Sequence, residues 1–465
     1  MNRPVPSFTA WSACVLALVL VASPRAAFAQ RGPVPSLGYF VGKGHLAAGE
    51  YPSALRIFHG ELAGGIKSTL GRGTDAVAYY AARGEARYHM GQYKQALDDF
   101  NAALNVFQSR PNWMVSVNFP AAIRPAAPGQ IQNAPWGRST RGAALGFYPD
   151  SYNSMQGQIN AANNVLRQGG GVVQQARLVP VNAAELVRAT ALALRRRREL
   201  LGPTGRFDPL TGELISSLVG PVAPPTSWSR AWADVMLGMA YGAAGKDAQA
   251  KQVLVKGHLA AGQFDHPLTA QALFELGRIE LTAGDYQRAT YFFTEASYSA
   301  YQYFDPMLIE EAVRYAQITH LMANNKGVCP LLTGVSTWAK RSTRYSHLKA
   351  SLAILTAENL SVRNDARSTK ALAEAAQIMK RARGQPASPM GARYNFTAAM
   401  LYYQKGKVSD GDAALNAALV FQKNGGSLWL HHLSLAKKLA VTTELSGRET
   451  YAVLGNLLRD PQPAD

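Results

Sequence analysis

The chain has 465 residues, a formal net charge of +18 and only two cysteines. A chain of this length can bury a core of adequate size, and so few cysteines exclude a fold held together by several disulfides. After residue 29 no stretch is apolar and long enough to cross a bilayer, which excludes a multi-span membrane protein. The positive charge favours polyanionic partners such as acidic polysaccharide, phospholipid surfaces or acidic proteins, although solvated helix faces would explain it equally well.

Residues 1–29 have the pattern of a secretory signal peptide. A short basic start precedes an apolar run at residues 13–22, and Ala27-Phe28-Ala29 is a small-residue cleavage site. The sequence therefore predicts an exported protein of the periplasm or cell surface, or a secreted one, without a transmembrane span after cleavage. An uncleaved anchor is the alternative. Cys14 lies inside the apolar run, which argues against a lipoprotein, and Cys329 would be the only cysteine of the mature chain.

Beyond residue 30, a set of small and aromatic residues recurs with constant spacing. In residues 82–104, two glycines seven positions apart are followed by Tyr, Ala, Phe and Ala, placed two, five, nine and twelve residues after the second glycine. Small residues let two helices approach closely, and glycine suits the left-handed residue that ends a helix. The residues that carry this frame are Gly42, Gly49, Tyr51, Ala54 and Phe58; Gly84, Gly91, Tyr93, Ala96, Phe100 and Ala103; Gly238, Gly245 and Ala250; and Gly277, Gly284, Tyr286, Ala289, Phe293 and Ala296.

At these positions the chain resembles the tetratricopeptide repeat (TPR) family, whose unit is a helix-turn-helix of 34 residues. The resemblance implies an all-α, TPR-like α-solenoid of antiparallel helical hairpins, because a single hairpin of this kind cannot bury its apolar face. We expect N-terminal repeats in residues 30–108 and central repeats in residues 230–305. Residues 306–461 would hold degenerate helical repeats and a C-terminal capping hairpin.

Residues 109–229 interrupt the repeats with a basic insert rich in Pro, Gly, Asn and Gln. Most of it lacks a usable periodicity, although residues 169–181 are compatible with a short β-hairpin. The large aromatic residues of the insert indicate that it drapes over the solenoid, where a loop in the groove would occupy the usual ligand surface. One helix is expected near residues 182–201, with Asn182 as its N-cap.

Four consecutive arginines, Arg195 to Arg198, lie near the end of this helix. Successive helical residues point about 100° apart, so all four cannot face one partner. The sequence favours a salt-bridged or solvated helix end, next to the negative C-terminus of the helix. Binding of an anionic envelope component is the alternative, and nucleic acid is disfavoured because export would separate the protein from it.

We find no catalytic or metal-binding motif in the sequence. It has no H-E-x-x-H, no G-x-S-x-G and no cysteine pair for a metal. His431 and His432 are adjacent on an expected helix and point in different directions, which is poor geometry for one metal ion. We therefore expect no enzyme activity, no metal and no cofactor, with an unrecognised site in the insert as the remaining enzymatic alternative.

In the repeat family, the first helix of each hairpin lines the concave groove. Carried over to this sequence, the resemblance implies a groove formed by Tyr39, Lys43, Glu85, Tyr88, His89, Trp232, Met236, Met239, Phe274, Arg278, Arg393, Phe396, Met400 and Tyr403. This aromatic and mildly basic surface suits an extended peptide or a partner helix. The predicted function is a non-catalytic protein–protein interaction scaffold or adaptor in the cell envelope. The alternative is a binding module for anionic polysaccharide or a membrane surface, through basic faces such as residues 340–383.

Overall fold

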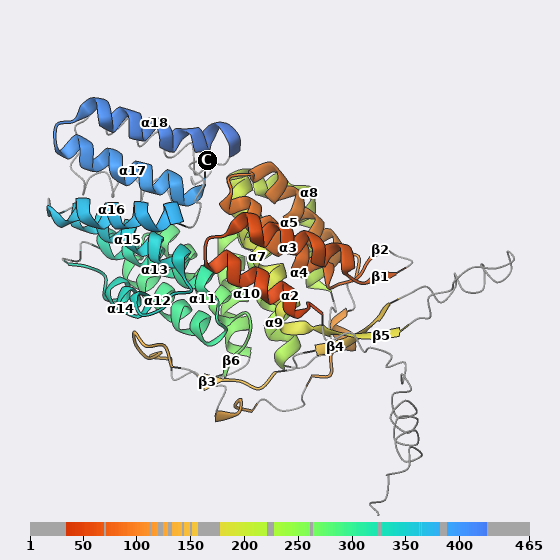
Figure 1. Ribbon diagram of the computed structural model, residues 1–465. Coiled ribbons are helices and arrows are strands. Elements are labelled where there is room, and N and C mark those ends of the chain that lie inside the picture. The colour runs from red at the N-terminus through yellow and green to blue at the C-terminus, as the bar shows by residue number, and fades with distance from the viewer. Residues whose placement is uncertain are drawn as a thin grey trace, which may run out of the picture.

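The computed structural model (Figure 1) describes residues 34–68, 71–110, 113–119, 124–128, 133–141, 144–148, 151–156, 177–220, 227–260, 264–323, 325, 327–361, 363, 365–381 and 388–425. Within these residues the fold is mostly helical, with sixteen α-helices and three two-stranded sheets. The expected signal peptide, and residues 426–461, where the capping hairpin was expected, lie outside the described residues.

Neighbouring helices pack as pairs along the chain, which confirms an all-α fold of the solenoid type. The N-terminal pairs are α2 (Leu37–Ala47) with α3 (Tyr51–Gly64) and α4 (Ala76–His89) with α5 (Tyr93–Gln108). The central pairs are α9 (Ser227–Ala243) with α10 (Asp247–Ala260) and α11 (Thr269–Ala283) with α12 (Tyr286–Gln302). The C-terminal helices are α13 (Pro306–Met322), α14 (Pro330–Lys340), α15 (Ser346–Ser361), α16 (Arg367–Arg381), α17 (Pro389–Gln404) and α18 (Val408–Gly425).

The spacing within four of these pairs is set by a glycine that faces a large side chain. A Cβ atom at Gly84 would lie 2.7 Å from Cε1 of Phe100, closer than real Cβ contacts, and Gly277 has the same relation to Phe293. The other two such contacts join Gly42 to Phe58 and Gly238 to Leu254. The remaining alanines and aromatics of the frame are buried, except that Tyr286 is only partly buried. The small residues are therefore contact points between helices.

The turn inside each pair also follows the frame. Its glycines have φ from 68° to 82°, the left-handed region in which glycine alone carries no steric penalty; they are Gly49, Gly91, Gly245, Gly284 and, in the degenerate copy, Gly406. At Gly284 this conformation ends α11, and the N–H of the glycine bonds the carbonyl of Leu281 at 3.1 Å.

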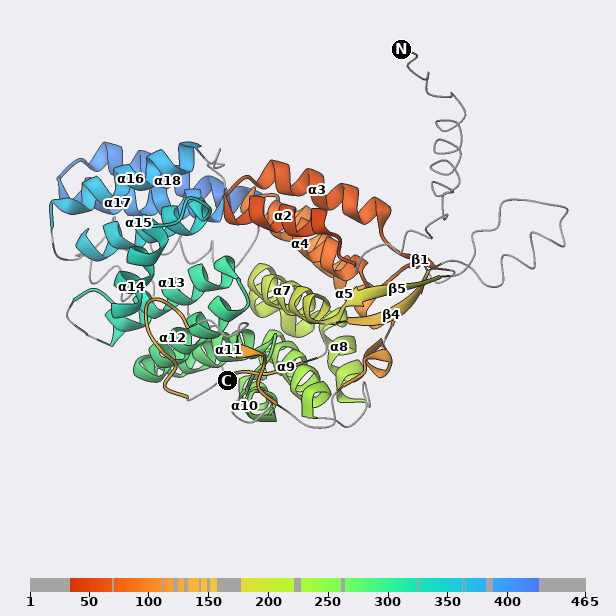
Figure 2. The ribbon, with the colours of Figure 1, turned by 60° about the horizontal axis from the view of Figure 1, so that its bottom comes forward.

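The two ends of the helical array meet. Helix α15 contacts α2, α17 contacts α4, and α18 contacts α5, so the stack curves back on itself. Figure 2 shows that the centre of this curve is occupied by α7 (Ala183–Leu201), which packs against α4, α5 and α9. The concave side of the solenoid is therefore filled by a helix of the insert.

The insert contains more regular structure than its sequence indicates. Asn182 Oδ1 accepts a hydrogen bond from the N–H of Glu185 at 2.8 Å, so the predicted N-cap of α7 is confirmed. A 3-10 helix (Gly202–Phe207) and α8 (Pro209–Val219), which was not predicted, follow α7. A strand does form at β5 (Arg177–Asn182), but its antiparallel partner is β4 (Ser151–Gln156), outside the expected stretch 169–181.

The remaining strands are short connections between helices. The antiparallel pair of β1 (Lys67–Ser68) and β2 (Gly71–Arg72) joins α3 to α4. The parallel pair of β3 (Ala144–Leu145) and β6 (Phe264–Asp265) attaches the insert just before α11.

The described parts of the insert loop lie against the solenoid, as its aromatic residues suggested. The ring of Trp136 lies 5.1 Å from that of Tyr301 on α12 and 5.0 Å from that of Trp338 on α14. Arg141 is paired with Asp265 and with Glu295, at 2.9 Å in each case. The loop thus drapes over α12 and α14, whereas α7 is the part of the insert that fills the groove.

The close contact between Gly84 and Phe100 predicts that a larger residue at position 84 destabilises the fold. Gly84→Ala should lower the free energy of unfolding by roughly 1–3 kcal/mol, because the added methyl group overpacks the pair α4–α5. Urea denaturation at neutral pH measures the change. Gly60→Ala on α3 is the matched control: a Cβ there meets nothing within 4 Å, so the better helix propensity of alanine should raise stability by about 0.5–1 kcal/mol. A stabilising Gly84→Ala would contradict the proposed limit on helix spacing.

Candidate functional site

The predicted groove residues do not line an open groove. Most of them are buried, namely Tyr39, Glu85, Tyr88, His89, Trp232, Met236, Met239, Phe274, Phe396 and Met400. The other four, Lys43, Arg278, Arg393 and Tyr403, are partly buried. Helix α7 takes the place that a partner helix would occupy, so these residues do not form a free surface for a peptide in this structure.

The N-terminal part of α7 is anchored by Glu185. Its Oε1 accepts hydrogen bonds from the Tyr39 hydroxyl and from Lys43 Nζ, both at 2.7 Å. Arg188, one turn along α7, lies 3.2 Å from Glu185 and also 3.2 Å from Asp305. Burial alone would raise the pKa of Glu185, but the charges of Lys43 and Arg188 outweigh it and hold this pKa below its ordinary value. Two predicted groove residues therefore bind a carboxylate of the chain itself.

The four consecutive arginines of α7, Arg195 to Arg198, are all buried, and together they reach several helices of the solenoid. Arg195 lies 3.0 Å from Glu311 of α13, as an ion pair without hydrogen-bond geometry, and its guanidinium lies 5.6 Å from the ring centroid of Phe274 of α11. Arg198 lies 3.1 Å from Glu275 of α11. A rotation of about 100° per residue explains why the run reaches more than one wall of the groove, although Arg195 and Arg196 share Glu311.

Arg196 has the most extensive set of partners. Its Nε and Nη2 atoms donate to both oxygens of Glu85 on α4 at 2.7 Å, and Nη2 also donates to Glu311 at 2.5 Å. Nη1 donates to Glu199, one turn further along α7, at 2.8 Å. Its guanidinium lies 4.3 Å from the ring centroid of Tyr88. These groups compensate a charge that would otherwise be costly to bury.

Arg197 points toward the outer layer formed by α5 and α8. It donates to Asn101 Oδ1 at 2.6 Å and to the Thr211 hydroxyl at 2.7 Å, and it forms an ion pair with Asp208. The expectation of a salt-bridged helix end is thus met, while a solvated end is excluded. The alternative that this run binds an anionic envelope component is wrong for this structure, because Arg195 to Arg198 are buried and engaged.

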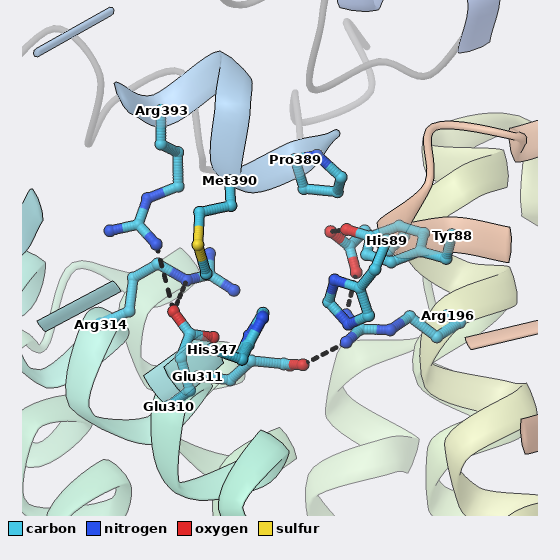
Figure 3. A pocket seen from close by; sticks show the side chains of 11 residues that line it. Tyr88, His89, Arg196, Glu310, Glu311, Arg314, His347, Pro389, Met390 and Arg393 are labelled. Atoms are coloured by element: carbon cyan, nitrogen blue, oxygen red, sulfur yellow. Dashed lines mark hydrogen bonds and ion pairs between the residues drawn. The ribbon is translucent and has the colours of Figure 1, made fainter. Parts of the chain in front are cut away.

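A polar chamber lies where α7 meets both ends of the array (Figure 3). The side chains around it are Tyr88, His89, Arg196, Glu199, Glu310, Glu311, Arg314, His347, Pro389, Met390 and Arg393. The space that water-sized molecules can reach is about 30 Å³, enough for roughly two waters at ~10–15 Å³ each. The chamber is therefore a small, water-sized space between charged side chains.

Glu310 on α13 is the main anionic group on the C-terminal side of the chamber. Arg393 Nη1 donates to its Oε1 at 3.1 Å, Arg314 Nε lies 3.3 Å from the same oxygen, and the Ser351 hydroxyl also donates to it. Burial would raise the pKa of this carboxyl group, but the two guanidiniums outweigh burial and lower the pKa to about 2. Glu310 is thus held as a carboxylate that joins α13, α15 and α17.

His347 on α15 closes the contact between the C-terminal and N-terminal helices. Its Nδ1 lies 2.6 Å from the Tyr51 hydroxyl, and its ring lies 4.8 Å from the ring of His89. Burial, reinforced by His89 and Arg196, lowers the pKa of His347 to about 3, although the nearby carboxylates Glu85 and Glu310 act in the opposite direction. The imidazole is therefore neutral near pH 7 and joins the two ends through a hydrogen bond.

Sequence reasoning placed Glu85 in the groove but did not identify the buried acidic residues of α11 and α13. Glu310 and Glu311 lie in the stretch PMLIEEAVRYAQ, where two adjacent acids interrupt an otherwise apolar helix. A buried acid of this kind needs a cation or a hydrogen-bond donor as its partner. The position of these acids in an apolar helix was therefore the available signal for buried ion pairs. Glu275 has the same character within α11, where the neighbouring residues are also buried.

No family model matches the chain, and no curated protein is significantly similar to it. Within the described residues, no helix is long and apolar enough to cross a membrane. The same residues contain no group of three or more His, Cys, Asp or Glu side chains placed to hold a metal ion. Cys329 is buried, and burial raises the pKa of its thiol. The resemblance to the TPR family remains a prediction based on the frame.

The ion pairs of Arg196 predict a large loss of stability upon truncation. Arg196→Met should lower the free energy of unfolding by about 3–5 kcal/mol, because Glu85 would stay buried without its arginine and Glu311 would keep only Arg195. Adding Glu85→Gln should restore part of this loss, as measured by urea denaturation. Arg367→Met is the control: it removes an exposed pair with Asp365 and should change stability little. Equal effects of the two single variants would contradict the assigned role of Arg196.

His347 predicts a pH dependence. Its pKa is lower in the folded protein than in the unfolded chain, so protonation favours unfolding, and stability should fall as the pH drops from about 6.5 to about 3. The slope from one such group is at most about 1.4 kcal/mol per pH unit. His347→Gln should flatten this part of the profile, measured as urea midpoints between pH 7 and pH 4. The same change at the exposed His59 should leave the profile unaltered, and a profile unchanged by His347→Gln would refute the assignment.

Proposed function

We propose that the protein is a non-catalytic scaffold or adaptor of the cell envelope that binds a partner protein. The occupied groove supports this reading of the fold, because it binds a helix through side chains of several solenoid helices, as a partner-binding groove would. The chain itself supplies that helix. A partner must therefore either displace α7 or use another surface.

The observation that carries the proposal is an exposed apolar stripe on α2, the first helix of the array. Leu37, Phe40 and Val41 are 80%, 42% and 50% exposed, respectively. Their spacing places them on one face of the helix, and a Cβ at Gly44, the next position of the stripe, would meet nothing within 4 Å. Single exposed apolar residues are ordinary, whereas several on one face of a helix support the proposal of an interaction site there.

The chemistry of this stripe suits a partner with an apolar helical face. Helix α2 has no acidic residue in its first turn, and its exposed face carries aliphatic and aromatic side chains. Affinity would come from burial of this apolar area, so added salt should weaken binding little. Binding of a partner in the groove would differ from binding to the stripe, because the ion pairs of α7 would have to break first.

The test is site-specific photocrosslinking in the native envelope fraction. A photoreactive residue at Phe40 should yield one defined adduct, whereas the same residue at Arg56, an exposed position on α3, should not. Val41→Glu should reduce the Phe40 adduct at least tenfold and leave the unfolding midpoint unchanged, while Arg56→Glu should leave the adduct intact. Adducts formed only after Arg196→Met has loosened α7 would instead favour binding in the groove.

A further inference from the structure

A partly exposed cluster of four aromatic side chains lies where the insert crosses α12 and α14. It consists of Trp136, Tyr301, Trp338 and Tyr345, which we call the aromatic cluster. The ring of Trp338 lies 5.0 Å from that of Trp136, 5.6 Å from that of Tyr301 and 5.3 Å from that of Tyr345. None of the four is fully buried, so the cluster reaches the surface while it packs on the apolar core beneath it.

Four exposed cations accompany the aromatic cluster in sequence. Lys340 and Arg341 follow Trp338 by two and three residues, Arg344 precedes Tyr345, and Arg138 follows Trp136 by two. None of these cations forms an ion pair with any part of the chain that the structure describes, in contrast to the buried arginines of α7. Nearby Glu295 and Asp265 are both engaged by Arg141. The surface therefore carries an uncompensated positive charge beside aromatic rings.

This pairing of groups has a specific ligand chemistry. The apolar C–H faces of sugar rings pack on aromatic rings through dispersion, and guanidinium groups pair with carboxylates by charge-assisted hydrogen bonds. A bilayer would instead require apolar side chains that protrude far enough to insert, whereas these rings pack edge-to-face or tilted against one another. We propose that the aromatic cluster and its four cations bind an acidic polysaccharide built of uronic acid units. This site is separate from the stripe on α2 and does not depend on it.

The test uses a hexamer of galacturonate and its uncharged methyl ester, with binding measured by calorimetry at low and moderate salt. The triple variant Lys340→Ser, Arg341→Ser, Arg344→Ser should weaken binding of the acidic hexamer at least tenfold. Lys370→Ser, Lys405→Ser, Lys407→Ser removes the same charge from other exposed positions and should change affinity less than twofold. Equal losses of affinity in both triple variants would mean that the hexamer is attracted non-specifically by positive charge, and would overturn the proposal.

A second variant separates stacking from charge. Tyr345→Ala keeps every cation. It should weaken binding of the galacturonate hexamer about threefold or more, while binding of inorganic polyphosphate should not change. Thermal unfolding shows whether Tyr345→Ala is folded. If it is not folded, the two triple variants alone test the proposal. Tight binding to phosphatidylglycerol vesicles without binding of the hexamer, or a Tyr345→Ala variant that affects both probes alike, would contradict the assignment to an acidic polysaccharide.

Discussion

The guanidinium of Arg196 lies between two carboxylates that come from helices on either side of α7 in the chain. Glu85 is 111 residues away in sequence and Glu311 is 115 residues away in the other direction. Removing a guanidinium from water costs several kcal/mol unless strong partners compensate it, so both carboxylates must reach this point in the folded protein. The bidentate geometry to Glu85 also fixes the direction of the guanidinium plane. This one contact requires α4, α7 and α13 to be in place together.

The neighbouring arginines fix the rotation of α7 about its axis. Turning the helix in place by about 100°, the angle between successive residues, would carry each guanidinium to the wrong part of the groove. Arg195 would lose Glu311, and Arg198 would lose Glu275. A purely apolar helix could turn within an apolar groove at little cost, whereas these pairs penalise such a rotation. The run of four buried arginines thus holds α7 in one orientation against α4, α11 and α13 and against the layer of α5 and α8.

The sequence predicts the local parts of this structure and misses the long-range ones. The contact of Gly84 with Phe100, the left-handed Gly284 and the Asn182 cap depend on residues within about sixteen positions, so spacing reveals them. The occupation of the groove by α7 depends on pairs more than a hundred residues apart, and no local periodicity encodes such pairs. The exposure of the predicted groove residues could not be inferred from the sequence, because it depends on a helix that belongs to the insert.

Occupation of the groove also changes how the solenoid holds together. In an open solenoid each repeat contacts only its neighbours, and stability is close to a sum of local terms. Here α7 contacts α4, α5 and α9 and forms ion pairs with α11 and α13, while α15 and α17 return to α2 and α4. A change in one hairpin therefore alters contacts that several others share, so energies at distant sites need not add. The groove of this protein is part of its core, so a molecule could enter it only by displacing α7 and breaking its ion pairs.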